Sequence, residues 1–397
     1  MKFVRKPALS EPGRTDQTAP IGQPRREGRM AAPVVERLEV SAYRIPTATP
    51  EADGTISWDS TTMVLVEAQA NSGERGLGYT YASAVAAPLI RDTLAPFVVG
   101  CRVDDVRVAW GAMIRTVRNV GRPGIAATAI SAVDTALWDL KARAVGQPLF
   151  LLLGAHRDEV PIYGSGGFTT YSKKQLCEQL AGWVDEGIPR VKMKIAKDWG
   201  TKPEEDLARV RVARQAIGAN AELFVDANGG YSAKQAIQIA QQFVEYDVSW
   251  FEEPVSSDHL RQLAFVRQQA PMRVAAGEYG YDPWYFRDML QAEAVDVIQA
   301  DATRCLGVTG FLEAGAEAHS FAIPFSAHTA PALHAQVGCA VPEILNVEYF
   351  FDHARIEDMF FDGVPRPVGG CLRPDPNRPG LGLELKRQDA ERWKIAA

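Results

Sequence analysis

The sequence lacks the features that mark membrane proteins, secreted proteins and thiolate metal sites. No apolar run in its 397 residues approaches the roughly eighteen that a membrane span needs, and no secretion-type signal opens the chain. The five cysteines are odd in number, scattered and without C-x-x-C spacing, so neither a disulfide framework nor a thiolate metal site is indicated. We therefore expect a cytoplasmic protein that does not bind a membrane.

Basic residues are also fewer than acidic ones. Lys and Arg number 43 against 49 Asp and Glu, which gives a formal net charge of −6. Such a chain has no overall attraction to nucleic acid, so we expect none as a partner, and an anionic substrate must meet local positive groups. The composition, 46% hydrophobic and 23% charged, is that of a globular protein.

The amino-terminal stretch differs from the rest of the chain. Residues 1–30 carry seven Lys or Arg against three acids, are rich in Pro and Gly, and show no hydrophobic periodicity. We predict that residues 1–33 are a flexible leader. The alternative is that the natural protein begins at Met30.

Residues 34–155 predict an α+β unit. VVERLEVSAYRIP is typical of a strand, and STTMVLVEAQANSGERGLGYTY predicts a hairpin closed at Asn-Ser-Gly. AATAISAVDTALWDLKARAVG has the apolar stripe of a helix and ends at Gly146. Between the first two strands, the polar segment from Thr47 to Asp59 is a candidate lid, and its lone Trp58 is a candidate substrate contact.

After residue 155 the pattern changes to short apolar runs that alternate with amphipathic helices. Such alternation indicates parallel strands, and eight units close into a TIM-type barrel. A doubly wound open sheet is the alternative, but no Gly-rich phosphate fingerprint follows the first run. We assign residues 156–352 to the barrel and 353–397 to a segment that packs back across the amino-terminal unit. The runs are 160–166, 190–195, 222–227, 249–254, 273–278, 296–301, 322–328 and 344–350.

Ionisable residues stand at the carboxyl end of most of these runs, where a parallel barrel gathers its reactive groups. Asp226, Glu252 and Glu278 end three consecutive runs. Three carboxylates packed together repel one another unless a cation lies among them. An all-oxygen set selects a hard ion, so we predict Mg²⁺, with Mn²⁺ as a possible substitute and a structural Ca²⁺ site as the alternative.

Two candidate bases flank this cluster. Lys192 and Lys194 lie two apart in VKMKI and so point the same way from a strand. A nearby cation and a second ammonium lower a lysine pKa, which would make Lys194 a general base. His328 ends the seventh run and Asp301 the sixth, close enough for the carboxylate to orient the imidazole.

The ordered motifs VKMKI, LFVDANG, WFEEP, AAGE, QAD and SAH, followed by Glu348 in NVEY, resemble those of the enolase superfamily and, within it, the mandelate racemase group. The resemblance runs from Val34 to the end of the chain. It implies the α/β class: a (β/α)7β barrel with an α+β capping domain that the carboxyl-terminal segment completes. It also implies a homo-oligomer.

The resemblance also implies a role for each site residue. Asp226, Glu252 and Glu278 would ligate Mg²⁺, with Glu253 beside them. Lys194 and His328 would be the two bases, and Asp301 would orient the histidine. Lys192 would hold the substrate carboxylate. Glu348 would share a hydrogen bond with the developing enolate oxygen, and Asn228 would contact substrate.

The shared chemistry is removal of the proton α to a carboxylate. We favour dehydration of an acid sugar, an aldonate or aldarate, to a 2-keto-3-deoxy acid. One reason is the polar lid segment; the other is a set of arginines that could contact hydroxyls or a distal carboxylate, unless they lie at the surface: Arg115, Arg118 and Arg122. Racemisation or epimerisation of a 2-hydroxy acid is the first alternative and non-catalytic binding of a sugar acid the second. The histidine dyad argues against dienoate cycloisomerisation.

Overall fold

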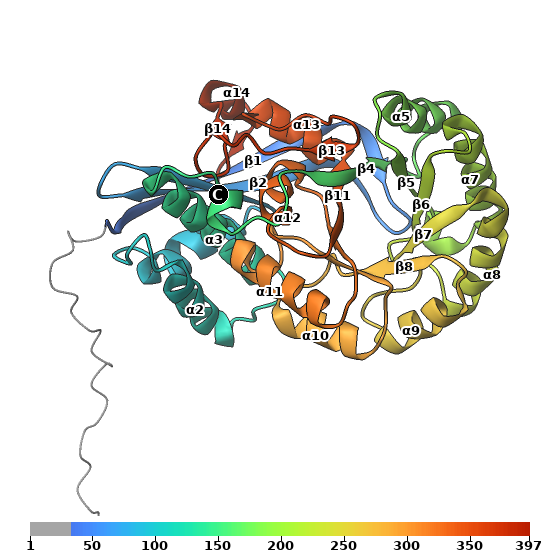
Figure 1. Ribbon diagram of the computed structural model, residues 1–397, viewed down its shortest axis with the longest axis horizontal. Helices are drawn as coiled ribbons and strands as arrows, with labels where there is room; N and C mark the ends of the chain where they lie inside the picture. The colour runs from blue at the N-terminus through green and yellow to red at the C-terminus, as the bar shows by residue number, and fades with distance from the viewer. Residues whose placement is uncertain (1–32) are drawn as a thin grey trace, which may run out of the picture. The chain divides into compact units, whose positions relative to one another are not determined.

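The computed structural model describes residues 33–397, so the predicted leader lies outside the described residues apart from Pro33. The described chain contains an antiparallel sheet with helices on it and a closed parallel barrel (Figure 1). None of the helices in this range is both long and apolar enough to cross a membrane.

The amino-terminal sheet has the strand order β15-β1-β2-β3. Helix α3 packs directly on β3, because Gly76 and Gly78 leave room for its backbone: a Cβ at Gly78 would lie 2.1 Å from the Ala132 carbonyl oxygen. The predicted helix, strand and hairpin are thus confirmed. The elements are β1 (Val35–Ala52), β2 (Ser57–Ala70), β3 (Arg75–Tyr81), α1 (Ala86–Leu89), η1 (Ile90–Leu94), η2 (Ala95–Phe97), α2 (Val106–Thr116), η3 (Val117–Asn119), α3 (Ile125–Ala144), α4 (Leu149–Leu152) and β15 (Lys394–Ile395).

The segment from Thr47 to Asp59 is not the irregular loop that its polarity suggests. Strand β1 continues to Ala52 and β2 begins at Ser57, so the segment is the far end of a long hairpin with a short turn. Glu51 pairs with Trp58 beyond a register shift. The tip rests on barrel loops: the Trp199 amide donates to the Gly54 carbonyl (2.9 Å) and the Thr169 amide to that of Ala52 (2.9 Å).

All eight predicted apolar runs are strands of one parallel barrel. Each pairs with its sequence neighbour, and β11 pairs with β4 to close the ring. This confirms the (β/α)7β fold and excludes the open sheet. The strands are β4 (Val160–Gly166), β5 (Arg190–Lys194), β6 (Glu222–Asp226), β7 (Val248–Glu252), β8 (Arg273–Ala276), β9 (Val297–Ala300), β10 (Phe325–Ala327) and β11 (Ile344–Phe350).

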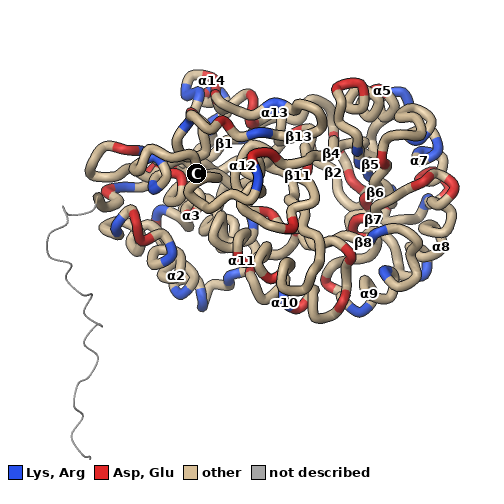
Figure 2. The backbone as a smooth tube through the Cα atoms, viewed as in Figure 1, with Lys and Arg blue, Asp and Glu red and all other residues tan. Residues whose placement is uncertain are grey.

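Helices connect the strands and surround the barrel (Figure 1). Two of them begin with a capping box, Ser172 with Gln175 and Ser232 with Gln235. Figure 2 shows that positively and negatively charged residues are interspersed along these outer helices. The helices are α5 (Lys173–Asp185), α6 (Lys197–Gly200), α7 (Pro203–Ile217), α8 (Ala233–Phe243), η4 (Val244–Tyr246), α9 (Leu260–Gln269), α10 (Pro283–Gln291), α11 (Gly307–Ser320) and α12 (Pro331–Gly338).

The carboxyl-terminal segment touches both parts of the fold. Strand β13 pairs with barrel strand β4, and β15 pairs with β1. The predicted contact with the amino-terminal sheet is therefore present, and the pairing with the barrel is an additional one. The segment contains α13 (Phe351–Phe360), β12 (Phe361–Asp362), β13 (Cys371–Leu372), β14 (Glu384–Leu385) and α14 (Arg387–Glu391). The domain boundaries at 155 and 352 stay predictions.

Candidate active site

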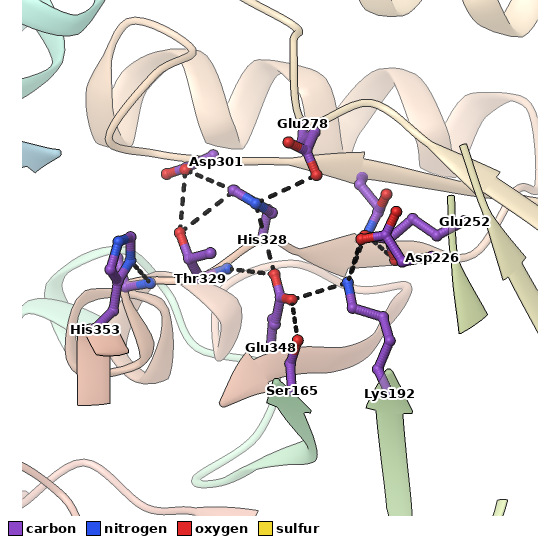
Figure 3. Close-up of polar contacts among 12 residues, drawn as sticks. Ser165, Lys192, Asp226, Glu252, Glu278, Asp301, His328, Thr329, Glu348 and His353 are labelled. Atoms are coloured by element: carbon purple, nitrogen blue, oxygen red, sulfur yellow. Dashed lines mark hydrogen bonds and ion pairs between the residues drawn. The ribbon is translucent and has the colours of Figure 1, made fainter. Parts of the chain in front are cut away.

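Lys192 and Lys194 point to the same side of β5, as their spacing predicts. Both ammonium groups approach Oδ2 of Asp226, Lys194 at 2.5 Å and Lys192 at 3.5 Å. Lys192 is completely buried, and it also contacts Glu252 and lies 2.8 Å from Oε1 of Glu348 (Figure 3). Val191 and Met193, which alternate with the two lysines along β5, are buried in the main hydrophobic core. Strand alternation therefore delivers the lysines to a cluster of acids.

Asp226, Glu252 and Glu278 lie together at the carboxyl ends of β6, β7 and β8. One carboxylate oxygen from each comes within 4.8 Å of the others, and all three residues are buried. Oε2 of Glu278 and Oε1 of the neighbouring Glu253 are buried without a hydrogen-bond partner among residues 33–397. Burial and the surrounding carboxylates raise the pKa of Glu253 well above its usual range. Three converging oxygens and excess negative charge fit a hard divalent cation.

The protein groups alone shift the Lys194 pKa in the direction opposite to the sequence-based expectation. Burial is the largest single influence and lowers this pKa, but the charges of Asp226, Glu278 and Glu348 together raise it above the usual lysine range. Asp226 has a lowered pKa in turn: burial opposes the shift, and Lys194 and Lys192 cause it. A positive charge among the carboxylates would compete for Asp226 and reverse this effect on Lys194. The expected low pKa therefore depends on a bound cation.

His328 and Asp301 form the predicted dyad. Nδ1 of His328 lies 2.9 Å from Oδ2 of Asp301, and Oδ1 of Asp301 accepts the Thr303 amide at 2.7 Å. Burial alone would raise the Asp301 pKa, but the hydrogen bond and charge of His328 lower it below its usual value. Nε2 of His328 is 3.4 Å from Oε2 of Glu278. Asp301 thus fixes the ring and leaves Nε2 toward the acidic cluster (Figure 3).

Glu348 lies between Lys192 and His328. Its Oε1 accepts from Ser165 Oγ at 2.6 Å and lies near Lys192, whereas its Oε2 accepts the Thr329 amide at 3.1 Å. Burial raises the Glu348 pKa, but the charges of Lys192 and His328 lower it well below its usual range. Glu348 is therefore a fixed anion, held by donors from three strands or their loops.

A cavity of about 210 Å³ opens beside these groups. Six of the predicted site residues line it: Trp58, Lys194, Asn228, Glu278, His328 and Glu348. Lys192, Asp226, Glu252 and Asp301 lie behind its wall, so the assignment of Lys192 to the substrate carboxylate stays a prediction. Oδ1 of Asn228 has no hydrogen-bond partner within residues 33–397, and Trp58 donates Nε1 to Oε2 of Glu51 at 2.9 Å.

The sequence interpretation missed other residues of the cavity wall. These are Thr61, Tyr279, Arg304, Thr329, Phe350 and His353; Asp53 and Ile56, which also line the cavity, belong to the predicted lid segment. Arg304 follows Asp301 by three positions in QADATR and approaches Glu278 at 3.4 Å and Asp301 at 3.6 Å. His353 lies five positions after Glu348. Arg304 and His353 each lie just after a strand that delivers a predicted site residue, Asp301 or Glu348. This position is the one signal in the sequence that could have indicated them.

Two arguments for a sugar substrate change with the structure. The arginine contacts considered as one option are not present: Arg115 and Arg118 are exposed, Arg122 pairs with Asp282 at 2.9 Å, and none of the three lines the cavity. Their surface alternative holds. The lid segment, although polar in composition, turns the apolar side chains of Ile56 and Trp58 to the cavity together with Asp53. Because side chains alternate along the hairpin, overall polarity did not reveal the inner face.

Comparison with known proteins agrees with this architecture. Residues 38–154 match the model of the mandelate racemase / muconate lactonizing enzyme N-terminal domain, and residues 175–390 match the enolase C-terminal domain-like model. A mandelate racemase/muconate lactonizing enzyme-like protein from Rubrobacter xylanophilus has a TM-score of 0.88 at 50% identity, covering 91% of this chain and 100% of its own.

More distant relatives differ in their activities. Arabinonate dehydratase of Saccharolobus solfataricus is 29% identical over 84% of this chain and 90% of its own length. A racemase from Streptomyces coelicolor, solved with bound magnesium, has a TM-score of 0.86 at 28% identity, over 91% of this chain and 100% of its own. D-galactarolactone cycloisomerase of Agrobacterium fabrum is 28% identical over 90% of this chain and 98% of its own length. The chain belongs to the enolase superfamily, in its mandelate racemase group.

Proposed function

We propose that the protein is a Mg²⁺-dependent enzyme that removes the proton α to a carboxylate and dehydrates an acid sugar to a 2-keto-3-deoxy acid. The observation that carries the proposal is the cavity wall that holds Lys194, His328 and Glu278 together. The proposal is supported by the dehydratases among the relatives and by the magnesium in a structural neighbour.

Asp226, Glu252 and Glu278 would hold the ion, because their oxygens converge and the set, among the described residues, consists of carboxylates alone. When bound, Mg²⁺ supplies fixed positive charge beside the substrate carboxylate, where negative charge grows as the proton leaves. In its predicted role of holding the substrate carboxylate, Lys192 would add a second positive charge.

Lys194 and His328 approach the cavity from different strands, β5 and β10, which β4 and β11 separate in the ring. Lys194 would take the α proton. His328, held by Asp301, would donate a proton from Nε2 to the departing β-hydroxyl, so that water leaves. The hydrogen bond predicted between Glu348 and the developing enolate oxygen needs a proton on one of the two oxygens, and the charges of Lys192 and His328 favour the ionised form of Glu348, so this role stays a prediction. The enol product then becomes the 2-keto acid in solution or in the site.

Epimerisation of a 2-hydroxy acid is the second candidate. The same separation of Lys194 and His328 favours it, because one group can remove the α proton and the other can return a proton to the opposite face. The racemase among the structural neighbours supports it as well. A non-catalytic sugar-acid binder would need none of these proton-transfer groups.

The test is incubation with a library of mono- and diacid sugars in D₂O with saturating Mg²⁺. Semicarbazide trapping detects the keto acid, and NMR detects deuterium at the α carbon. Keto acid supports dehydration, and deuterated epimers without keto acid support the second candidate. Binding without α-proton exchange would leave only a binding protein.

Lys194→Met and His328→Asn separate the two roles. For a dehydratase, each should lower turnover by roughly 10²–10⁴-fold, as expected for loss of a general acid or base. Lys194→Met should also abolish α-proton exchange, whereas His328→Asn should retain exchange catalysed by Lys194. The cytoplasmic location and the homo-oligomer stay predictions; light scattering on purified protein checks the second.

A further inference from the structure

His353 is a cavity residue that the proposed chemistry does not use. It stands in α13, five positions beyond Glu348, and only 8% of it is exposed. Its ring stacks on Tyr81 with centroids 3.5 Å apart and an interplanar angle of 14°, and Phe350 packs edge-on at 5.1 Å. Two aromatic neighbours therefore fix the plane of the imidazole.

The hydrogen bonding of His353 assigns its tautomer. The Ala330 amide donates to Nδ1 at 3.4 Å, so Nδ1 carries no proton and Nε2 is the N–H donor. Nε2 has no hydrogen-bond partner among the described residues. It is also absent from their fully buried unpaired atoms, so we infer that Nε2 is accessible from the cavity that His353 lines. Burial and the charge of His328 lower the His353 pKa to about 3, so the ring is neutral.

The position of His353 sets the part of a substrate that it can meet. In Figure 3 it lies on the far side of His328 and Thr329 from Asp226, Glu252 and Lys192. For a small acid with its carboxylate at the acidic cluster and its α carbon by Lys194 and His328, His353 belongs to the remaining cavity wall, where it can meet the carbons beyond the α carbon. A neutral donor there suits a hydroxyl oxygen.

The charges of the cavity wall disfavour a second carboxylate at that end. Arg304, the guanidinium of the wall, is already shared between Glu278 and Asp301. The lid adds Asp53, whose Oδ1 accepts from the Thr55 and Ile56 amides. A diacid would therefore place a distal anion beside a neutral imidazole and an acidic lid, without a free cation on this wall.

We propose that His353 is a substrate-orienting residue whose Nε2–H donates to a hydroxyl beyond the α carbon, and that the site takes monocarboxylic sugar acids rather than diacids. This inference rests on the proposed function for the placement of the substrate carboxylate. It narrows the substrate class from aldonates and aldarates to aldonates.

The experiment measures binding with Mg²⁺ by calorimetry for three kinds of probe: four- to six-carbon aldonates, the matching aldarates, and lactate, which has no hydroxyl beyond the α carbon. His353→Phe keeps the aromatic stack and loses the donor. His353→Gln places an amide near the position of Nε2. His319→Gln is the matched control, because His319 is exposed and paired with Glu343.

We expect at least one aldonate to bind the wild type more tightly than lactate and than its own aldarate. His353→Phe should weaken that aldonate roughly 5- to 100-fold, the range for leaving one polar group unpaired, and should leave lactate unchanged. His353→Gln should recover most of the loss, and His319→Gln should have no effect.

Three results would overturn the inference: an equal loss for lactate and aldonate in His353→Phe, aldarates that bind more tightly than aldonates, or no aldonate that binds more tightly than lactate. Failure of the proposed function would give a different result from failure of this inference. The expected binding pattern would persist, but no probe would exchange its α proton in D₂O.

Discussion

Asp301 holds His328 by a hydrogen bond of 2.9 Å between Oδ2 and Nδ1, and Thr303 holds Asp301 in turn. We predict that Asp301→Asn lowers turnover by roughly 10²–10⁴-fold, because an amide no longer favours the protonated imidazole. Steady-state kinetics across pH checks this. Glu343→Gln, which changes the surface partner of His319, is the control and should be silent. Unchanged turnover in Asp301→Asn would remove the dyad from the mechanism.

Metal removal should destabilise the protein. Chelation leaves Asp226, Glu252 and Glu278 to repel one another, whereas Mg²⁺ at 100 times its Kd stabilises the folded state by about 2.7 kcal/mol. Calorimetric unfolding with and without Mg²⁺ measures the difference. Glu278→Gln should shrink the Mg²⁺-dependent rise in Tm. Glu222→Gln, at the opposite end of β6 from Asp226, should keep the full rise. A rise that survives in Glu278→Gln would place the ion elsewhere.

Stability should fall between about pH 4.5 and 8 through Glu51. Burial first, and then Asp352, raise the pKa of this carboxyl from 4.5 to about 8. In that window the folded state keeps a proton that the unfolded chain has lost, so stability decreases as pH rises and levels off above it. Glu51→Gln removes this contribution, so its Tm should depend less on pH and should exceed that of the wild type at pH 8.

Other buried acids titrate in the same range. Burial is the first cause in each case and raises the pKa of Glu357 to about 8 and that of Asp134 to about 7. The informative quantity is therefore the difference between the Tm curves of wild type and Glu51→Gln. Parallel curves from pH 5 to 8 would mean that Glu51 is ionised throughout.

Gly54→Ala should loosen the lid hairpin. A Cβ at Gly54 would lie 2.6 Å from the Ile195 carbonyl oxygen and 2.8 Å from that of Ala196, and backbone atoms cannot move aside cheaply. We expect a higher KM and faster hydrogen exchange at residues 47–59, with little change in Tm. Gly182→Ala in α5 meets nothing within 4 Å and is the control. Wild-type exchange rates in Gly54→Ala would show that the tip is not pressed against the barrel.

The barrel was predictable because buried parallel strands are short apolar runs, and each of the eight is present within a few residues of its expected bounds. The charged residues that end these runs follow from the same rule. Lys192 and Lys194 illustrate it, since period-two alternation alone placed both on the acidic side.

Prediction failed where distant segments decide the environment. The hairpin that carries Trp58 reads as a polar loop, because its inner face is defined only by barrel loops more than one hundred residues away, such as Thr169. Arg304 and His353 carry no periodic signal, and their place in the cavity depends on how α11 and α13 leave the barrel. The direction of the Lys194 pKa likewise depends on which charges occupy the cluster.

The pairing of β15 with β1, in which Ala42 faces Ile395 and Tyr43 faces Lys394, joins the beginning of the fold to its last residues. During synthesis on the ribosome, β1 cannot pair with β15 until residues 394 and 395 have been made. Until then it is an open template for strands of other nascent chains. Removal of the last four residues would leave Ala42 and Tyr43 of this edge permanently without that pairing.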